Sequence, residues 1–163
     1  MAMNVHMSVE GTTQGLITEG CSVVEGREDT STVMKLEQVV EIPWNVQDGR
    51  AQGLRIHRPL RIVKAIDRAS PLLATAITTN ELLKVTFNFY RYNPDGDGKE
   101  EQFYTIELEK ANLITYRGEL PFTLDTESSR FPALETLEFA FEKIKTTFTR
   151  DGREFTDNFR IRT

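Results

Sequence analysis

The segment NPDGDGKEE, which begins at Asn93, has the carboxylate spacing that opens a calcium-binding loop. Asn93, Asp95 and Asp97 stand at its first, third and fifth positions, and Gly98 stands at the sixth. The twelfth position, where a bidentate glutamate is required, is Tyr104. The flanking segments alternate with the period of strands, whereas the calcium motif needs helices. A β-turn that uses glycine at positive φ explains the segment more simply, so we expect no metal site and no cofactor.

His57 and Cys21 are the other side chains that could do chemistry. His57 would need a nucleophile or an orienting carboxylate to act as a general base, and no serine or cysteine motif points to one. Cys21 is the single cysteine, and a catalytic thiolate would need a nearby cation or a helix N-terminus. We therefore expect His57 to pack or to hydrogen-bond at a strand end or subunit contact, and Cys21 to be a small, partly buried apolar residue.

Three glutamates, Glu135, Glu138 and Glu142, could supply paired carboxylates for glycoside hydrolysis. Their neighbours place Glu138 and Glu142 on the outward face of an amphipathic strand, where solvated charge is the better explanation. The sequence contains no GxGxxG, GxxxxGK[ST] or GxSxG motif. We do not expect an enzyme.

The composition predicts one soluble domain that spans residues 1–163. The net charge of −5 argues against a nucleic-acid binder. The N-terminus lacks a signal-peptide pattern, and no window approaches the roughly 20 apolar residues of a membrane helix. A single cysteine excludes an internal disulfide framework. These features predict a cytoplasmic protein without membrane insertion.

The charges are unevenly distributed along the chain. Residues 1–48 carry eight acids and two bases, whereas residues 50–68 carry six bases and one acid, Asp67. Solvated strand faces would explain this pattern, and so would two complementary surfaces for head-to-tail contact with other copies. A nucleic-acid groove fits less well, because the basic run lacks aromatic residues for base stacking.

Short segments of period-two alternation dominate the chain and predict about nine strands in a barrel or sandwich. The slip in alternation between Phe141 and Ile144 predicts a β-bulge near Lys143, and Asp151-Gly152 predicts a hairpin turn. The predicted strands lie around Val5–Val9, Cys21–Glu25, Thr32–Ile42, Leu54–His57, Leu60–Ile66, Val85–Phe89, Phe103–Leu108 with a continuation at Leu113–Tyr116, Leu137–Phe141 and Glu154–Phe159.

One helix is predicted, at Ser70–Thr79. Ser70 is expected to cap its first turn, and Pro71 suits the first helical position because its missing amide loses no bond there. The aromatic residues that alternate with polar ones are expected to fill the core; they are Phe87, Phe89, Phe103, Phe139, Phe141 and Phe148.

The segment RIHRPLRIVKAIDRASPLLATA, from Arg55 to Ala76, resembles the haemolysin-coregulated protein (Hcp) family. The likeness continues in residues 87–113 and 137–159. The signature residues are Arg55, His57, Pro59, Lys64, Asp67, Ser70 and Pro71, together with Ala76. One departure is Asp157-Asn158-Phe159, where many relatives are expected to carry a tryptophan.

The resemblance implies a mainly β fold: a compact β-barrel of two sheets with one short flanking helix, assembled as a hexameric ring. Stacked rings would form the inner tube of a type VI secretion system, which sheath contraction expels with a spike at its tip. Effector proteins would travel in the lumen, and the subunit would leave the cytoplasm without a signal peptide. A plain tube subunit without a C-terminal toxin domain is expected.

Charged residues are the expected subunit or ring contacts, with the segment Gly26–Ile42 as an extended loop that reaches a neighbouring ring. The residues expected at such contacts are Arg27, Glu28, Asp29, Arg50, Arg58 and Arg61. Two alternatives remain open. A tail-tube subunit of a phage or other contractile particle would share the architecture, and a monomeric β-barrel could instead bind a small ligand.

Overall fold

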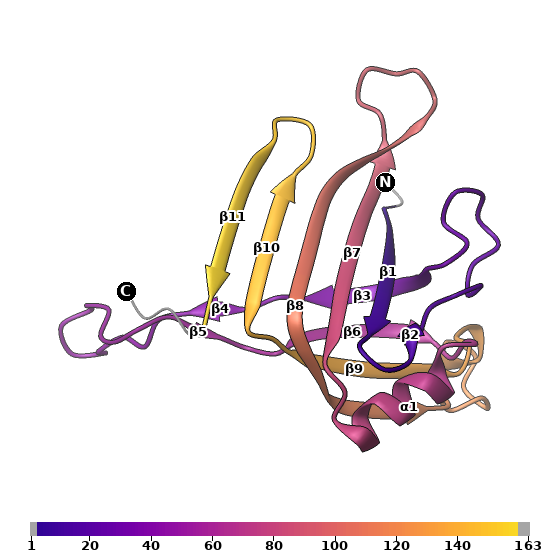
Figure 1. Ribbon diagram of the computed structural model, residues 1–163, viewed down its shortest axis with the longest axis horizontal. Helices are drawn as coiled ribbons and strands as arrows, with labels where there is room; N and C mark the ends of the chain where they lie inside the picture. The colour runs from indigo at the N-terminus through magenta and orange to yellow at the C-terminus, as the bar shows by residue number, and fades with distance from the viewer. Residues whose placement is uncertain (1–2, 160–163) are drawn as a thin grey trace.

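The computed structural model describes residues 3–159, which form a closed antiparallel β-barrel with one helix on its flank (Figure 1). The chain is mainly β, as the alternation of its sequence predicts. Its elements are β1 (Asn4–Gly11), β2 (Gly15–Leu16), β3 (Ser31–Glu37), β4 (Val40–Glu41), β5 (Ile56–His57), β6 (Leu60–Ala65), α1 (Ser70–Thr79), β7 (Leu83–Tyr92), β8 (Glu100–Glu119), the 3-10 turn η1 (Ser128–Arg130), β9 (Leu134–Ala140), β10 (Lys143–Phe148) and β11 (Arg153–Asn158).

The barrel closes in the order β8-β7-β1-β3-β6-β9 and back to β8. In Figure 1 the upright strands β1, β7 and β8 cross the horizontal strands β3, β6 and β9. The long strand β8 belongs to both sets: it pairs with β7 and β10 before Lys110, and mainly with β9 after it. Lys110 has a φ of 48°, a left-handed conformation that turns the strand at this corner.

Alternating apolar side chains fill the inside of the barrel. Leu83, Val85 and Phe87 of β7 are buried, and the Phe87 ring meets Phe139 of β9 edge to face with centroids 6.4 Å apart. The other four aromatic residues predicted for the core differ in burial. Phe141 is buried at the arm side, whereas Phe89, Phe103 and Phe148 form a half-buried aromatic cluster on β7, β8 and β10.

The helix spans the predicted residues, and Leu73 and Ala76 pack into the core. The predicted capping role of Ser70 is wrong, because the N-cap residue is Ala69 and no side chain caps the helix. The Ser70 hydroxyl instead accepts from the amide of Asp67 at 3.0 Å. The helix ends at Thr79, and the C-cap residue Asn80 has a φ of 51°, which lets its amide and that of Glu81 bond to carbonyl groups of the last turn.

The predictions for residues 21–25 and for Lys143 differ from the structure. Residues 21–25 form no strand, and the short strand that follows β1 is Gly15–Leu16. The predicted bulge near Lys143 is instead a break between β9 and β10: both strands pair with β8, and the partner on the other side changes from β6 to β11. The predicted Asp151-Gly152 turn does join β10 to β11, with Gly152 at a φ of 66°.

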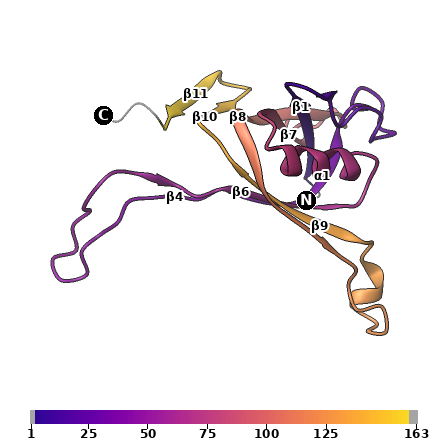
Figure 2. The same ribbon diagram turned by 60° about the horizontal axis from the view of Figure 1, so that its bottom comes forward.

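A projecting arm, residues 38–59, is the most prominent departure from the barrel (Figure 2). It consists of β4, β5 and the turn between them, where Trp44 bridges Ala51 and Gly49 has a φ of 68°. The predicted extended loop, Gly26–Ile42, therefore lies too early in the sequence. Residues 26–30 fold back beside the barrel. Within the predicted loop Gly26–Ile42, only residues 38–42 enter the arm.

Among residues 3–159, no helix has the length and apolar character needed to cross a membrane.

Candidate functional site

The signature residues of the Arg55–Ala76 segment build two ionic networks in the folded chain. The first network contacts the start of α1. Its central residue is Lys64, whose side chain is fully buried. Its ammonium group pairs with Glu135 on the neighbouring strand β9 and with Oδ1 of Asp67 at 2.8 Å. It also donates to the backbone oxygen of Ala65 at 3.2 Å. A buried charge needs such partners, since an unpaired one is strongly unfavourable.

The same network orients the helix. Ser70 donates its hydroxyl to Oε1 of Glu135 at 3.0 Å, and Asp67 accepts from the amide of Ala69 at 2.9 Å. Burial raises the pKa of Tyr116 to about 12, with a further contribution from the nearby Glu135 carboxylate. These residues therefore join β6, β8, β9 and the first turn of α1 into one unit.

The second network is a clamp at the base of the arm, formed by Arg55, His57 and Asp157. Arg55 pairs with Asp157 through Nε and through Nη2, the latter 2.6 Å from Oδ1, and it donates to the backbone oxygen of Asn158 at 3.2 Å. Nε2 of His57 lies 2.7 Å from Oδ2 of the same carboxylate. The hydrogen bond from Arg55 lowers the pKa of Asp157 to about 2, and His57 adds to the effect against partial burial.

Two phenylalanine rings enclose the His57 side chain, which is 1% exposed. Phe141 and Phe159 meet the imidazole edge to face, with centroids 5.5 and 5.0 Å away. His57 thus packs and hydrogen-bonds at a strand end, as the sequence predicts. Asp157 supplies the orienting carboxylate that a general base would need. However, Arg55 also binds this carboxylate, and the His57 ring is shielded from solvent. The arrangement suits fixing of the arm.

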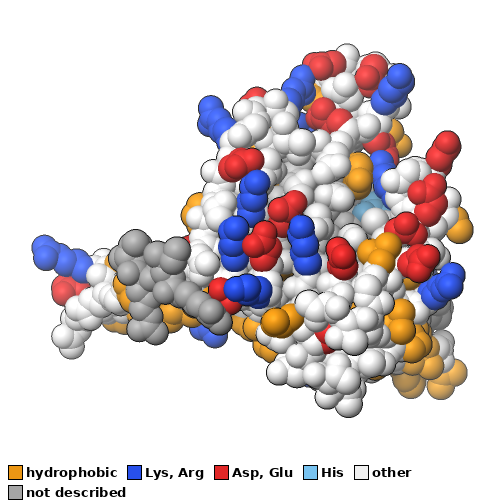
Figure 3. Space-filling model, viewed as in Figure 1, with side chains coloured by type: hydrophobic (Ala, Val, Ile, Leu, Met, Phe, Trp, Pro, Cys, Tyr) orange, Lys and Arg blue, Asp and Glu red, His pale blue; other side chains and the backbone are white. Residues whose placement is uncertain are grey.

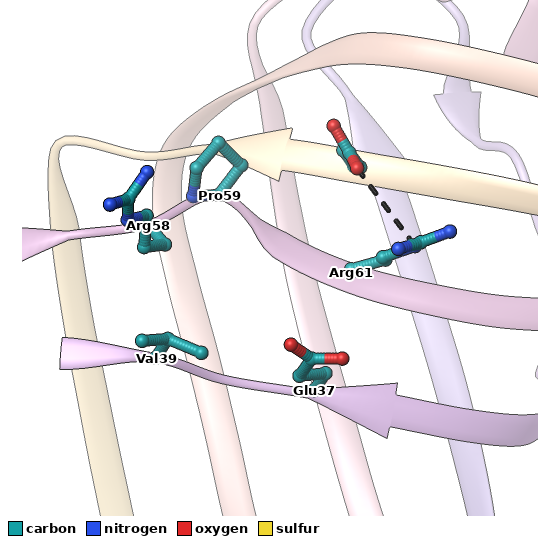
Figure 4. Close-up of a pocket in the computed structure, with 6 residues that line it drawn as sticks. Glu37, Val39, Arg58, Pro59 and Arg61 are labelled. Carbon is teal, nitrogen blue, oxygen red and sulfur yellow. Dashed lines mark ion pairs between the residues drawn. The ribbon is translucent and has the colours of Figure 1, made fainter.

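The two signature prolines stand at the edges of these networks. Pro71 begins the exposed side of α1. Pro59 lines a hollow of about 380 Å³ at the base of the arm, where the strands of the arm part from β3 and β6 (Figure 4). Its walls carry charges of both signs, and Arg61 reaches Glu138 at 3.9 Å across it.

Of the residues expected at subunit contacts, Arg27 is held within its own chain. Its guanidinium lies 3.4 Å above the ring centre of Tyr90 and pairs with Glu100 at 2.9 Å. Glu28 and Asp29 are exposed, but each carboxylate accepts a local backbone amide, from Gly26 and Gly20 respectively. The geometry assigns these residues a role in shaping their loop.

The basic run of residues 50–68 also finds partners inside the subunit. Arg58 is exposed and pairs with Glu41 on the opposite strand of the arm, at 2.7 Å from Nε to Oε1. Arg61 pairs with Glu138, and Arg50 is exposed in the turn of the arm. Figure 3 shows basic and acidic side chains interspersed over β8, β10 and β11 as well. Arg58 joins the two halves of the charge asymmetry within one chain, whereas Arg55, Arg61 and Lys64 pair with acids outside residues 1–48.

The arm exposes apolar side chains that nothing in its own subunit covers in the described part of the chain. Trp44 is 63% exposed and Val46 78% exposed. The further exposed apolar residues of the arm are Val40, Ile42, Leu54 and Ile56. A protruding two-stranded ribbon with such a surface is poorly stabilised alone and is typical of a segment that packs against another chain.

The remaining candidates for chemistry have structural roles. In the Asn93–Gly98 turn, Gly96 and Gly98 have φ values of 77° and 73°, as the turn prediction requires. Oδ2 of Asp95 pairs with Arg150 at 2.7 Å. Cys21 is half-buried against the core, and its burial raises the pKa of its thiol, which disfavours a reactive thiolate. Within residues 3–159, no cluster of three or more His, Cys, Asp or Glu is arranged to hold a metal ion.

Asp157 and Glu135 are the functional positions that sequence reasoning missed. The sequence marks Asp157 only as a departure from the family pattern, and Glu135 as one of three glutamates with no distinguishing feature. Their partners lie 102 and 71 residues away, Arg55 for Asp157 and Lys64 for Glu135. Lys64 shares the alternating face of Leu60 and Ile62, and this pattern is the signal that could have indicated an inward lysine in need of an acidic partner.

Comparisons with known proteins agree on one family. The model of "Type VI secretion system effector, Hcp" matches residues 6–148. The "Major exported protein" of Pseudomonas aeruginosa is 36% identical, over 98% of this chain and 97% of that protein.

Solved structures extend the likeness to three dimensions. A crystal structure of Hcp protein superposes with a TM-score of 0.90 at 26% identity, and covers 98% of this chain and 99% of that chain. The secreted protein Hcp3 from Pseudomonas aeruginosa superposes with a TM-score of 0.80 at 34% identity, over 98% of this chain and all of that one (100%).

Proposed function

The chain belongs to the Hcp family of type VI secretion proteins, and we propose that it is a structural subunit of the type VI secretion tube. The observation that carries this proposal is the match of nearly the whole chain, barrel and arm together, to Hcp structures. Its function is then mechanical: copies associate into hexameric rings, rings stack into a hollow rod, and a contracting sheath expels the rod.

The exposed arm supports self-association as the basis of this function. It extends well beyond the barrel (Figure 2), and its apolar side chains gain stability only when a second chain covers them. The filled interior argues for the same conclusion. Met7, Ile62, Phe87 and Phe139 are completely buried in the barrel, which leaves little room for the cavity of a ligand-carrying monomer.

The proposed partners follow from the tube role. They are other copies of the chain, the spike and sheath of the secretion machine, and effector proteins held in the lumen. The subunit would assemble in the cytoplasm and be secreted through the machine. No catalytic residue is proposed, because His57 is engaged with Asp157 and the signature carboxylate Asp67 is engaged with Lys64.

Particle mass and shape test the proposal. We expect purified protein to form rings of about six times the 18.7 kDa subunit mass, visible by negative-stain electron microscopy. A stable monomer at high concentration would contradict the tube and favour the ligand-binding barrel. Co-purification with a phage-type sheath, in place of a type VI sheath, would favour the tail-tube alternative.

A further inference from the structure

The arm meets the barrel at a break in the hydrogen-bonded ladders. Pairing of β3 with β6 ends at Glu37 and Arg61, and pairing of β4 with β5 starts again at Val40 and His57. Between them one backbone bond remains, from the amide of Arg58 to the oxygen of Val39 at 3.0 Å. The hollow seen in Figure 4 occupies this break. Two strands joined so sparsely form a natural hinge.

The clamp spans this hinge. Arg55 and His57 join the arm to β11 through hydrogen bonds and ion pairs with Asp157, and Arg55 also donates to the backbone oxygen of Asn158. The remaining side-chain pair of the arm base, Arg58 with Glu41, connects the two strands of the arm to each other. The Asp157 carboxylate therefore binds two side chains of the arm base, and His57 also packs between Phe141 and Phe159.

We propose that Asp157 is a positioning residue that locks the hinge at the base of the arm and so couples the arm to the C-terminal hairpin. Arg55 binds the carboxylate through two nitrogens, which fixes an angle as well as a distance. With the lock closed, the arm presents its apolar side chains in one direction. With the lock open, the hinge lets the arm sample many directions. The consequence for ring assembly rests on the proposed function, whereas the lock itself does not.

Intrachain distances measured by pulsed electron paramagnetic resonance test the lock. One spin label at Gln47 in the arm and one at Lys84 on β7, in a Cys21→Ser background, report the direction of the arm; both sites are exposed. Labelled subunits are diluted into unlabelled ones, so that only distances within one chain contribute. We expect a single narrow distance peak in the parent and loss of that peak in Asp157→Asn.

Two further variants keep the test decisive. Arg55→Gln leaves the contact between His57 and Asp157 in place, and should broaden the peak even if Asp157→Asn fails to fold. Arg150→Gln removes the exposed pair between the β10–β11 turn and Asp95 of the β7–β8 turn, and should leave the peak unchanged. A narrow, unshifted peak in folded Asp157→Asn or Arg55→Gln would overturn the proposal.

Particle mass on the same variants separates the two claims. A freed arm together with loss of rings supports both the lock and its role in assembly. A freed arm with intact rings would support the lock and contradict its role in assembly. A rigid arm in the variants would overturn the lock whether or not rings form.

Discussion

Lys64 and Glu135 face each other across β6 and β9 with both side chains completely buried. Three residues away in the same strand pairing, Arg61 and Glu138 form a partly exposed pair at 3.9 Å. The two pairs share strands and chemical type and differ in burial, so they allow a direct comparison of buried and surface ion pairs.

We expect Glu135→Gln to lower the free energy of unfolding by about 3–5 kcal/mol, because it leaves the Lys64 charge buried without its main partner. The surface counterpart Glu138→Gln should cost less than about 1 kcal/mol. Urea denaturation followed by fluorescence measures both. Equal effects of the two substitutions would show that burial of the pair has no energetic consequence.

Stability in acid should depend on Asp157. Its folded-state pKa is about 2, below the ordinary value of 3.8, because Arg55 and His57 favour the ionised form. The contribution is therefore fully present above pH 3.8 and is lost as the pH falls toward 2. Thermal melting between pH 5 and pH 2 measures the loss. Asp157→Asn should remove this part of the pH dependence, whereas Asp151→Asn, in the exposed hairpin turn, should leave it in place.

Glu81 should hold the turn between β1 and β2. Its buried carboxylate accepts from the amides of Thr13 at 2.5 Å and Gln14 at 2.8 Å, and a Cβ at Gly11 would lie only 2.5 Å from Oε1. We expect Glu81→Ala to destabilise the subunit by about 1–3 kcal/mol, since two amides lose their acceptor. Hydrogen exchange at Thr13 and Gln14 should accelerate together. Unchanged hydrogen exchange at Thr13 and Gln14 in this variant would show that the turn is stable without the Glu81 carboxylate.

The apolar side chains of the arm should matter for assembly more than for folding. Trp44→Ser and Val46→Ser are expected to leave the subunit within about 0.5 kcal/mol of its parent, because both side chains are exposed. Ring formation, measured by light scattering, should decrease. Leu124→Ser, at an 86% exposed position in the β8–β9 connection, is the control for loss of surface apolarity in general.

Salt should weaken ring association more than it lowers subunit stability, since exposed charges are screened and the buried Lys64 network is not. Arg58→Glu should add to the weakening, because it places a second acid opposite Glu41 on the arm. Light scattering across a salt series, with thermal melting at each concentration, tests both statements. If ring association changes neither with salt nor in Arg58→Glu, charged contacts do not stabilise the interface.

Local pattern in the sequence predicted the elements whose stability is local. Period-two alternation found the long strands, Ser70-Pro71 marked the start of the helix, and Asp151-Gly152 marked a hairpin turn, because each depends on backbone preferences within a few residues. The Arg55–Ala76 segment also indicated the family. The same reasoning failed at residues 21–25 and near Lys143, where the route of the chain between strands overrides local preference.

Tertiary structure alone decided which charges are partners. The sequence shows a basic run at residues 50–68 but cannot show that Lys64 is buried against Glu135 or that Arg55 and His57 share Asp157, because these contacts join strands about 70 to 100 residues apart. It predicted strands that include β4 and β5, but it could not show that residues 38–59 project from the barrel as an arm. The position of the arm depends on a break between two ladders and on one carboxylate from the last strand, which come together only in the folded barrel.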